Sequence, residues 1–251
     1  AQLVQEMRLF KSEFEINVMR KAAEISASAH VNAMKIAKPG IKEYELDAEL
    51  ISTFVTHGAR SPAYPSIVGA GRNGCILHYI DNNSQINNGD LVLIDAGAEY
   101  DFYAADITRT FPINGRFTPE QKTVYEIVLE AQRAAIEAVR PGNCWNDPHE
   151  AAVKVITKGL IDMKILSGNL NKLIADESFR PYFMHRTGHW LGMDVHDVGE
   201  YKVDGEWRVF EEGMVTTVEP GLYFSNNIPG LDPKWWDIGI RIEDDVLVTE
   251  A

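Results

Sequence analysis

Residues 89–97 read Gly-Asp-Leu-Val-Leu-Ile-Asp-Ala-Gly, and residues 213–221 read Gly-Met-Val-Thr-Thr-Val-Glu-Pro-Gly. Both segments contain a glycine, an apolar run typical of a buried strand, a carboxylate and a second glycine. The two carboxylates, Asp95 and Glu219, occupy the same position in this template. A carboxylate at the end of a buried strand needs a compensating charge. Its presence in both segments indicates a metal site and an internal repeat.

Asp95 has a second carboxylate, Asp106, a short distance along the chain. A tight turn at Tyr100-Asp101 would place the two aspartates opposite each other in a hairpin, with Cβ atoms about 4.5–5.5 Å apart. Burying two unpaired like charges costs several kcal/mol each, and a bound cation removes that cost. The alternative is that Asp106 caps a turn while Asp95 pairs with Arg109.

Three histidines lie within residues 184–199, a largely apolar segment interrupted by glycines: His185, His189 and His196. Imidazole is a common metal ligand and the usual acid or base near neutral pH. This segment is therefore a second source of candidate ligands and catalytic groups.

Residues 238–248 predict a further strand, whose apolar alternation is interrupted by Arg241 and Glu243. Residues two apart in a strand face the same side of the sheet, so both side chains point toward the core. The two residues either form a simple ion pair or belong to the same site as the aspartates.

The first half of the chain predicts two helices before the strand that ends at Asp95. Ser12 and Glu15 form a capping box, and the helix that follows is expected to stop at Lys38-Pro39-Gly40. A second helix is expected over about residues 43–57. Of the remaining histidines, His30, His57 and His149 fall in helical stretches, and we expect them to be structural.

The second half opens in the same way. Thr118-Pro119-Glu120-Gln121 predicts a capped helix that ends at Arg140-Pro141-Gly142, and Asp147-Pro148 predicts the start of the next one. Two helices followed by strands, twice, form the expected repeat, with most of the additional residues of the second half in residues 163–181.

The composition limits the classes of partner. The chain has 251 residues, of which 45% are hydrophobic, and 24 basic against 37 acidic residues give a net charge of −13. This charge argues against nucleic acid as a partner. No stretch approaches eighteen consecutive apolar residues and no signal-peptide pattern opens the chain, so the sequence predicts no membrane partner and a cytoplasmic protein. Two cysteines give no disulfide framework.

The ordered motifs of this chain resemble a known family. These motifs are LIDAG (93–97), ADITRTF (105–111), HRTGHWLGMDVHDVG (185–199), TVEPGLY (217–223) and GIRIEDD (239–245). They are similar to those of the metal-dependent, creatinase-like "pita-bread" peptidases, and most of all to the aminopeptidase P branch. The resemblance implies an α+β pita-bread fold, with helices covering a curved antiparallel sheet.

The resemblance also implies a domain organisation. We expect one catalytic domain over residues 1–251, built from two pseudo-symmetric halves at about 12–112 and 118–250. Relatives usually carry an N-terminal domain that helps assembly, and we expect this domain to be absent from the chain. The sequence therefore leaves open whether the chain forms a homo-oligomer.

Carried over by position, the resemblance implies five ligands of a two-metal centre: Asp95, Asp106, His189, Glu219 and Glu243. In the family the second and the last of these bridge the two ions. It further implies a set of catalytic side chains: Glu219, His78, His185, His196 and Arg241. The three histidines surround the substrate, and the arginine holds a carboxylate in position.

Four carboxylates and one imidazole suit manganese, cobalt or zinc, and we expect manganese. Two such ions can lower the pKa of a shared water molecule and polarise a carbonyl group. The expected mechanism is attack on the scissile carbonyl by a hydroxide that bridges the ions. Glu219 takes the proton of the water, and His185 or His196 stabilises the oxyanion or the leaving group.

The resemblance implies an aminopeptidase that hydrolyses the N-terminal Xaa-Pro bond, with peptides carrying proline at the second position as partners. A dipeptidase that cleaves Xaa-Pro dipeptides is the nearest alternative. A non-catalytic relative of the same fold is a further alternative, although such relatives typically lose several ligands and all five positions are filled here.

Overall fold

The structure is a computed structural model that describes residues 2–250. Its helices are α1 (Gln2–Leu9), α2 (Glu13–Ile36), α3 (Glu43–Thr56), α4 (Pro119–Ala138), α5 (Asp147–Asp162) and α6 (Leu170–Ala175), with the 3-10 helices η1 (Gly71–Cys75) and η2 (Pro233–Trp235). Its strands are β1 (Ser61–Pro62), β2 (Ile67–Ala70), β3 (Leu91–Asp95), β4 (Ala98–Tyr100), β5 (Tyr103–Ala104), β6 (Thr108–Pro112), β7 (Lys202–Val203), β8 (Glu206–Trp207), β9 (Val215–Val218), β10 (Gly221–Phe224), β11 (Ile238–Arg241) and β12 (Asp244–Leu247).

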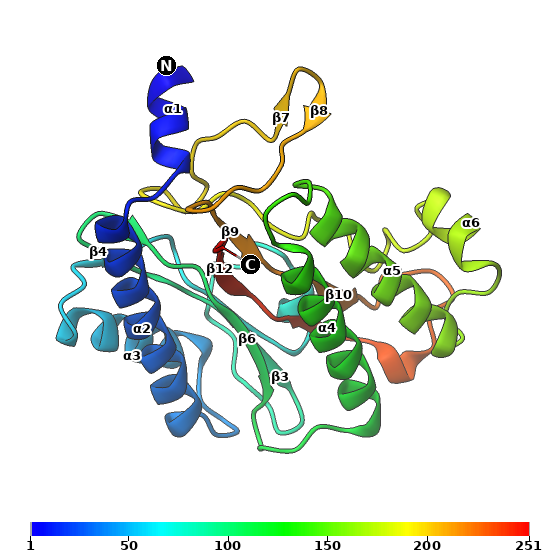
Figure 1. Cartoon of the computed structure of the whole chain (residues 1–251). Coiled ribbons are helices and arrows are strands. Elements are labelled where there is room, and N and C mark those ends of the chain that lie inside the picture. The colour runs from blue at the N-terminus through cyan, green and yellow to red at the C-terminus, as the bar shows by residue number, and fades with distance from the viewer. Residues whose placement is uncertain (1, 251) are drawn as a thin grey trace.

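Helices flank the strands on two sides, with α2 and α3 on the left of Figure 1 and α4 and α5 on the right. The strands pair in the orders β1-β4-β5, β2-β3-β6, β7-β8, β9-β12 and β10-β11, and each of these pairings is antiparallel. The predicted α+β class is therefore confirmed.

The predicted helix starts are confirmed by their capping contacts. The side chain of Ser12 accepts a hydrogen bond from the backbone N–H of Glu15, whose carboxylate accepts one from the Ser12 N–H in return. Thr118 and Gln121 form the same reciprocal pair at the start of α4. α5 begins at Asp147, as the Asp-Pro signal predicted.

The predicted hairpin register is wrong by two residues. Asp95 lies opposite Thr108, and Asp106 precedes β6. The turn is formed by Asp101-Phe102, with φ angles of 45° and 70°, and not by Tyr100-Asp101. A two-residue turn with both φ angles positive matches the twist of the strands, and here it does so without a glycine to mark it in the sequence.

The predicted strand at 238–248 is broken in two. β11 pairs with β10, whereas β12 pairs with β9, so the chain changes partner between them. Glu243 lies at this change, where its backbone N–H donates to the carbonyl of Thr108 at 3.1 Å. The break thus brings a carboxylate of the C-terminal segment to the start of β6.

Two large buried clusters support these strands. One packs α2 and α3 against β2 and β3 and includes Leu46, Phe54 and Val92. The other packs α4 and α5 against β10 and β11 and includes Ile156 and Leu222. Each buried side chain of this size contributes about 1.5–3 kcal/mol to the free energy of unfolding. The relation between the halves at 12–112 and 118–250 stays a prediction.

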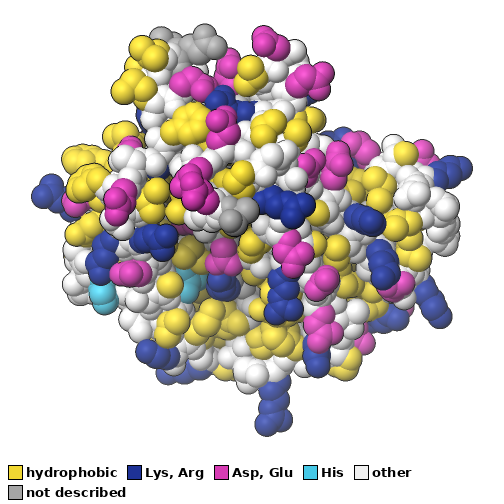
Figure 2. All heavy atoms as spheres, viewed as in Figure 1, with side chains coloured by type: hydrophobic (Ala, Val, Ile, Leu, Met, Phe, Trp, Pro, Cys, Tyr) yellow, Lys and Arg dark blue, Asp and Glu magenta, His cyan; other side chains and the backbone are white. Residues whose placement is uncertain are grey.

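α1 projects from the body of the molecule near the hairpin β7–β8 (Figure 1). The face in Figure 2 mixes acidic and basic side chains, and hydrophobic side chains gather over α1, where Leu3, Val4 and Met7 are exposed. Among the described residues, none of the helices has the length and apolar character that a membrane crossing requires.

Candidate metal centre

A cavity of about 420 Å³ lies among the segments that carry the sequence motifs. Its walls come from the regions around β3, β6, β10 and β11 and from the loop that contains the three histidines. The cavity is lined by every side chain that the sequence predicted for the site: His78, Asp95, Asp106, His185, His189, His196, Glu219, Arg241 and Glu243.

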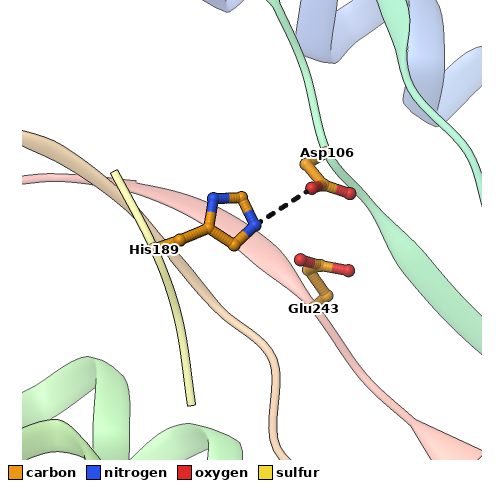
Figure 3. Close-up of side chains that lie close together, drawn as sticks. All are labelled: Asp106, His189 and Glu243. Atoms are coloured by element: carbon orange, nitrogen blue, oxygen red, sulfur yellow. Dashed lines mark ion pairs between the residues drawn. The ribbon is translucent and has the colours of Figure 1, made fainter. Parts of the chain in front are cut away.

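Three of the predicted ligands lie close enough together to bind one ion. One ligand atom from each of Asp106, His189 and Glu243 lies within 4.8 Å of the other two. Figure 3 shows these side chains pointing toward one another from separate segments of the chain. His189 Nε2 is 3.3 Å from Asp106 Oδ2 and 3.6 Å from Glu219 Oε1, so the fourth predicted ligand adjoins this group.

Asp95, the fifth predicted ligand, is joined to the group through a tyrosine hydroxyl. Tyr64 donates to Asp95 Oδ1 at 2.7 Å and lies 2.5 Å from Asp106 Oδ1. The other Asp95 oxygen accepts a hydrogen bond from Arg241. The two aspartates therefore face one space although they are not opposite each other in the hairpin.

The two alternative ion pairs that the sequence left open do not form. Arg109 lies 2.6 Å from Asp244 and does not pair with Asp95. Arg241 pairs with Asp95, and its neighbour Glu243 accepts a hydrogen bond from Thr108. Both results leave the predicted ligands directed toward the cavity.

The charges of the site do not balance among the side chains alone. Burial raises the pKa of Asp95 and Glu243, and it raises the pKa of Glu219 to about 7. Arg241 is the permanent cation among these residues. A hard, oxygen-rich donor set with excess negative charge fits divalent ions such as manganese, cobalt or zinc.

The orientation of His189 suits a metal ligand. Its Nδ1 lies 3.0 Å from the carbonyl oxygen of Trp190, which accepts the Nδ1 proton and leaves Nε2 facing the carboxylates. Burial opposes protonation of the ring, but Asp106 and Glu219 outweigh it and raise the pKa of His189 to about 9. A proton or a cation is therefore favoured at Nε2.

His185 is bound at both ring nitrogens. Nδ1 donates to the carbonyl oxygen of Arg186 at 2.7 Å, and Nε2 accepts from the hydroxyl of Tyr223 at 2.8 Å. Burial, reinforced by the charge of Arg241, lowers the pKa of His185 to about 3, so the ring is neutral near pH 7. Arg241 in turn donates to the Tyr223 hydroxyl at 3.0 Å, which connects His185 to Asp95.

His78 and His196 differ from His185, since neither ring has a hydrogen-bond partner among residues 2–250. The ring of His196 packs edge-on against His189, with centroids 4.4 Å apart. Both rings are exposed to the cavity and are free to contact a bound molecule.

The loop that carries His196 is held by ion pairs to the N-terminal segment of the chain. The carboxylate of Asp197 lies 3.6 Å from Lys11 Nζ and accepts a hydrogen bond from Arg8. Arg8 also lies 2.8 Å from Asp194. The N-terminal segment of the chain is thereby tied to one wall of the cavity.

Sequence reasoning missed three hydroxyl groups of the site, those of Tyr64, Thr108 and Tyr223. Thr108 lies two residues after Asp106. Residues two apart in a strand face the same side, so this spacing could have predicted that Thr108 belongs to the site. Tyr223 is the last residue of the TVEPGLY motif, and that position offered a weaker signal. Nothing in the sequence around Tyr64 distinguishes it from an ordinary loop tyrosine.

The histidines expected to be structural lie outside this cavity. His30 Nε2 lies 3.0 Å from the carbonyl of Ala96, and His57 contacts the carbonyl of Thr53 at the end of α3. His149 contacts the Thr187 hydroxyl at 2.9 Å, so it holds residues 184–199 from outside the cavity.

Comparison with known proteins identifies relatives over the whole described chain. The sequence profile of metallopeptidase family M24 matches residues 17–250. The Xaa-Pro aminopeptidase of Escherichia coli K12 is 51% identical over 249 residues, which cover 99% of this chain and 56% of that protein. The Xaa-Pro aminopeptidase of Haemophilus influenzae is 48% identical, over 99% of this chain and 57% of that protein.

Solved structures agree with the sequence relatives. Pseudomonas aeruginosa aminopeptidase PepP superposes with a TM-score of 0.97 at 58% identity, over 98% of this chain and 56% of that one. Zinc-substituted E. coli aminopeptidase P in complex with product superposes with a TM-score of 0.96 at 51% identity, over 99% and 56% of the two chains. The chain thus spans somewhat more than half the length of these relatives.

The family match covers most of the chain, and the structural match confirms the predicted pita-bread fold. The chain therefore belongs to metallopeptidase family M24.

Proposed function

We propose that this chain acts as a single catalytic unit that hydrolyses the N-terminal Xaa-Pro bond of peptides. The observation that carries the proposal is the gathering of four carboxylates, four histidines and Arg241 around one cavity. The similarity to Xaa-Pro aminopeptidases at about 50% identity supports the same reaction.

Five side chains would hold two divalent ions: Asp95, Asp106, His189, Glu219 and Glu243. When bound, such ions lower the pKa of a water molecule and polarise a carbonyl group, which is the chemistry that amide hydrolysis requires. We propose manganese as the native metal, because four of the five ligands are carboxylates.

Glu219 is the proposed general base. Its carboxylate lines the cavity beside His189, where it can take a proton from water and return it to a leaving nitrogen. The Thr217 hydroxyl lies 3.4 Å from Glu219 Oε1 and supports its orientation.

His196 is the proposed donor to the substrate carbonyl or leaving group, and His78 is proposed to hold the bound substrate, because the ring nitrogens of both are free. His185 is engaged at both nitrogens, so its proposed role is to hold the Tyr223 hydroxyl in place. The proposed role of Arg241 is to orient Asp95, whose carboxylate accepts its hydrogen bond.

The cavity is also lined by apolar side chains that suit a proline ring. Its apolar lining consists of Pro65, Ile67, Leu77, Ile80 and Val195. A rigid apolar ring next to the cleaved bond fits these side chains better than a polar or charged side chain does.

The test is an assay of the purified chain loaded in turn with Mn²⁺, Co²⁺ and Zn²⁺. Three substrates are compared: an Xaa-Pro-Xaa tripeptide, an Xaa-Pro dipeptide and a Met-Xaa peptide without proline. We expect cleavage of the tripeptide and the highest kcat with Mn²⁺. Preference for the dipeptide would favour the dipeptidase alternative, and a metal-loaded chain that cleaves none of the three would contradict the proposal.

A further inference from the structure

Glu43 is a fully buried carboxylate that lies outside the metal centre. It is the first residue of α3, and none of its surface is exposed. No ion pair in the described part of the chain includes it. Burying a carboxylate without a cation is costly unless hydrogen bonds and a helix N-terminus compensate for the lost water.

Each oxygen of Glu43 accepts two hydrogen bonds. Oε1 accepts from the backbone N–H of Ala70 at 2.9 Å and from Asn73 Nδ2 at 3.0 Å. Oε2 accepts from the hydroxyl of Tyr79 at 2.7 Å and from the backbone N–H of Ser84 at 2.8 Å. The four donors come from both sides of His78 in the sequence, so one carboxylate ties together the whole segment 70–84.

That segment forms one wall of the substrate cavity. Leu77, His78 and Ile80 line the cavity, yet residues 76–84 belong to no helix or paired strand of the described chain. The side chain of Asn82 adds one further attachment, by bonding the N–H of Val68 and the carbonyl of Ser66 at 2.9 Å each. The position of this wall therefore depends on hydrogen bonds that involve the side chains of Glu43 and Asn82.

We propose that Glu43 is a positioning residue for substrate binding, which fixes the wall that carries His78 relative to the metal ligands. The inference rests on the proposed function. Glu43 touches neither the substrate cavity nor a metal ligand, so its loss acts on how well the substrate is held and leaves the metal-dependent step in place.

The test variant is Glu43→Gln, which keeps the shape but replaces one acceptor with an NH₂ group that faces two donors. The matched control is Glu45→Gln in the same helical turn, because the Glu45 carboxylate is exposed and caps only the backbone N–H of Lys42. With a metal-saturated Xaa-Pro-Xaa assay, we expect Glu43→Gln to raise KM about tenfold, the effect of one buried hydrogen bond, with kcat within about twofold. The control should match the wild type in both constants.

A double-mutant comparison separates positioning from general damage. His78→Ala should raise KM strongly in the wild-type background and only weakly in the Glu43→Gln background, because the wall is already displaced. Equal effects of His78→Ala in both backgrounds, or an unchanged KM in Glu43→Gln, would overturn the inference.

Hydrogen exchange provides a readout that does not depend on activity. Amides of residues 70–84 should exchange faster in Glu43→Gln than in the wild type, while those of α4 should not change. Wild-type protection of residues 70–84 in the variant would overturn the inference. A wild-type chain that cleaves no Xaa-Pro peptide would contradict the proposed function alone, and the exchange experiment would still decide the role of Glu43.

Discussion

The hydroxyl of Tyr223 lies 2.8 Å from Nε2 of His185, and the same hydroxyl accepts a hydrogen bond from Arg241 at 3.0 Å. Tyr223 is almost fully buried, so this single oxygen joins a neutral histidine to the arginine that holds Asp95. One chain of hydrogen bonds thus holds His185, Tyr223, Arg241 and Asp95 in place.

Removing this hydroxyl should be costly. Tyr223→Phe leaves His185 Nε2 and one Arg241 N–H without partners in a buried site, and we expect a loss of about 1–3 kcal/mol in the free energy of unfolding. Urea denaturation measures it. Tyr182→Phe is the control, since the Tyr182 hydroxyl makes no hydrogen bond to the described residues and its ring packs on Phe224. Equal losses in the two variants would contradict this reading.

Glu219→Gln should lose activity and keep its fold. If Glu219 transfers the proton, kcat falls about 10²–10⁴-fold in the metal-saturated enzyme. Turnover is measured together with metal content and circular dichroism, because Glu219 is also a proposed ligand. Turnover within a few-fold of the wild type at full metal occupancy would remove Glu219 from the mechanism.

Metal removal should lower the melting temperature. Ions that bind the folded state alone at one hundred times their Kd stabilise it by about 2.7 kcal/mol. For a chain of this size, that corresponds to a shift of about 5–10 °C. Calorimetry before and after chelation, followed by return of Mn²⁺, measures the shift. A melting temperature that does not respond to the chelator would show that metal binding is not coupled to folding.

Lys11 should make stability depend on pH in the alkaline range. Burial lowers its pKa from 10.5 to about 8, despite the nearby charge of Asp197. Between these two values the unfolded chain binds more protons, so the free energy of unfolding rises with pH, by about 2 kcal/mol from pH 8 to pH 10. The Lys11→Met variant should lack this rise in chemical denaturation at the two pH values. Parallel curves for the variant and the wild type would contradict the prediction.

Local signals in the sequence predicted most of the elements. The capping pairs at Ser12 and Thr118 depend only on residues three apart, and both are present in the structure. The five expected ligands were named through the family resemblance of their motifs, and all of them line one cavity. The residues alone indicated a metal site at Asp95 and Glu219, because carboxylates in buried strands are rare without a partner.

The hairpin register and the support of the site needed the structure. Asp101 and Phe102 adopt positive φ angles that their residue types do not predict. The hairpin turn was therefore predicted one residue too early in the sequence. The hydroxyls of Tyr64 and Tyr223 act on residues far away in the sequence, and no periodic pattern encodes such contacts. Contacts between distant segments are decided by packing, and local sequence patterns carry no information on packing.

The ion pairs of Arg8 and Lys11 with Asp197 have a practical consequence for anyone who trims this protein. The family match begins at residue 17, after both cations, while Asp197 directly follows His196. A fragment cut at that border would keep every recognisable motif and still leave a buried anion without its counter-ions. The residue at which the family match begins and the residue from which the ion pairs of this fold begin are, in this molecule, two different places.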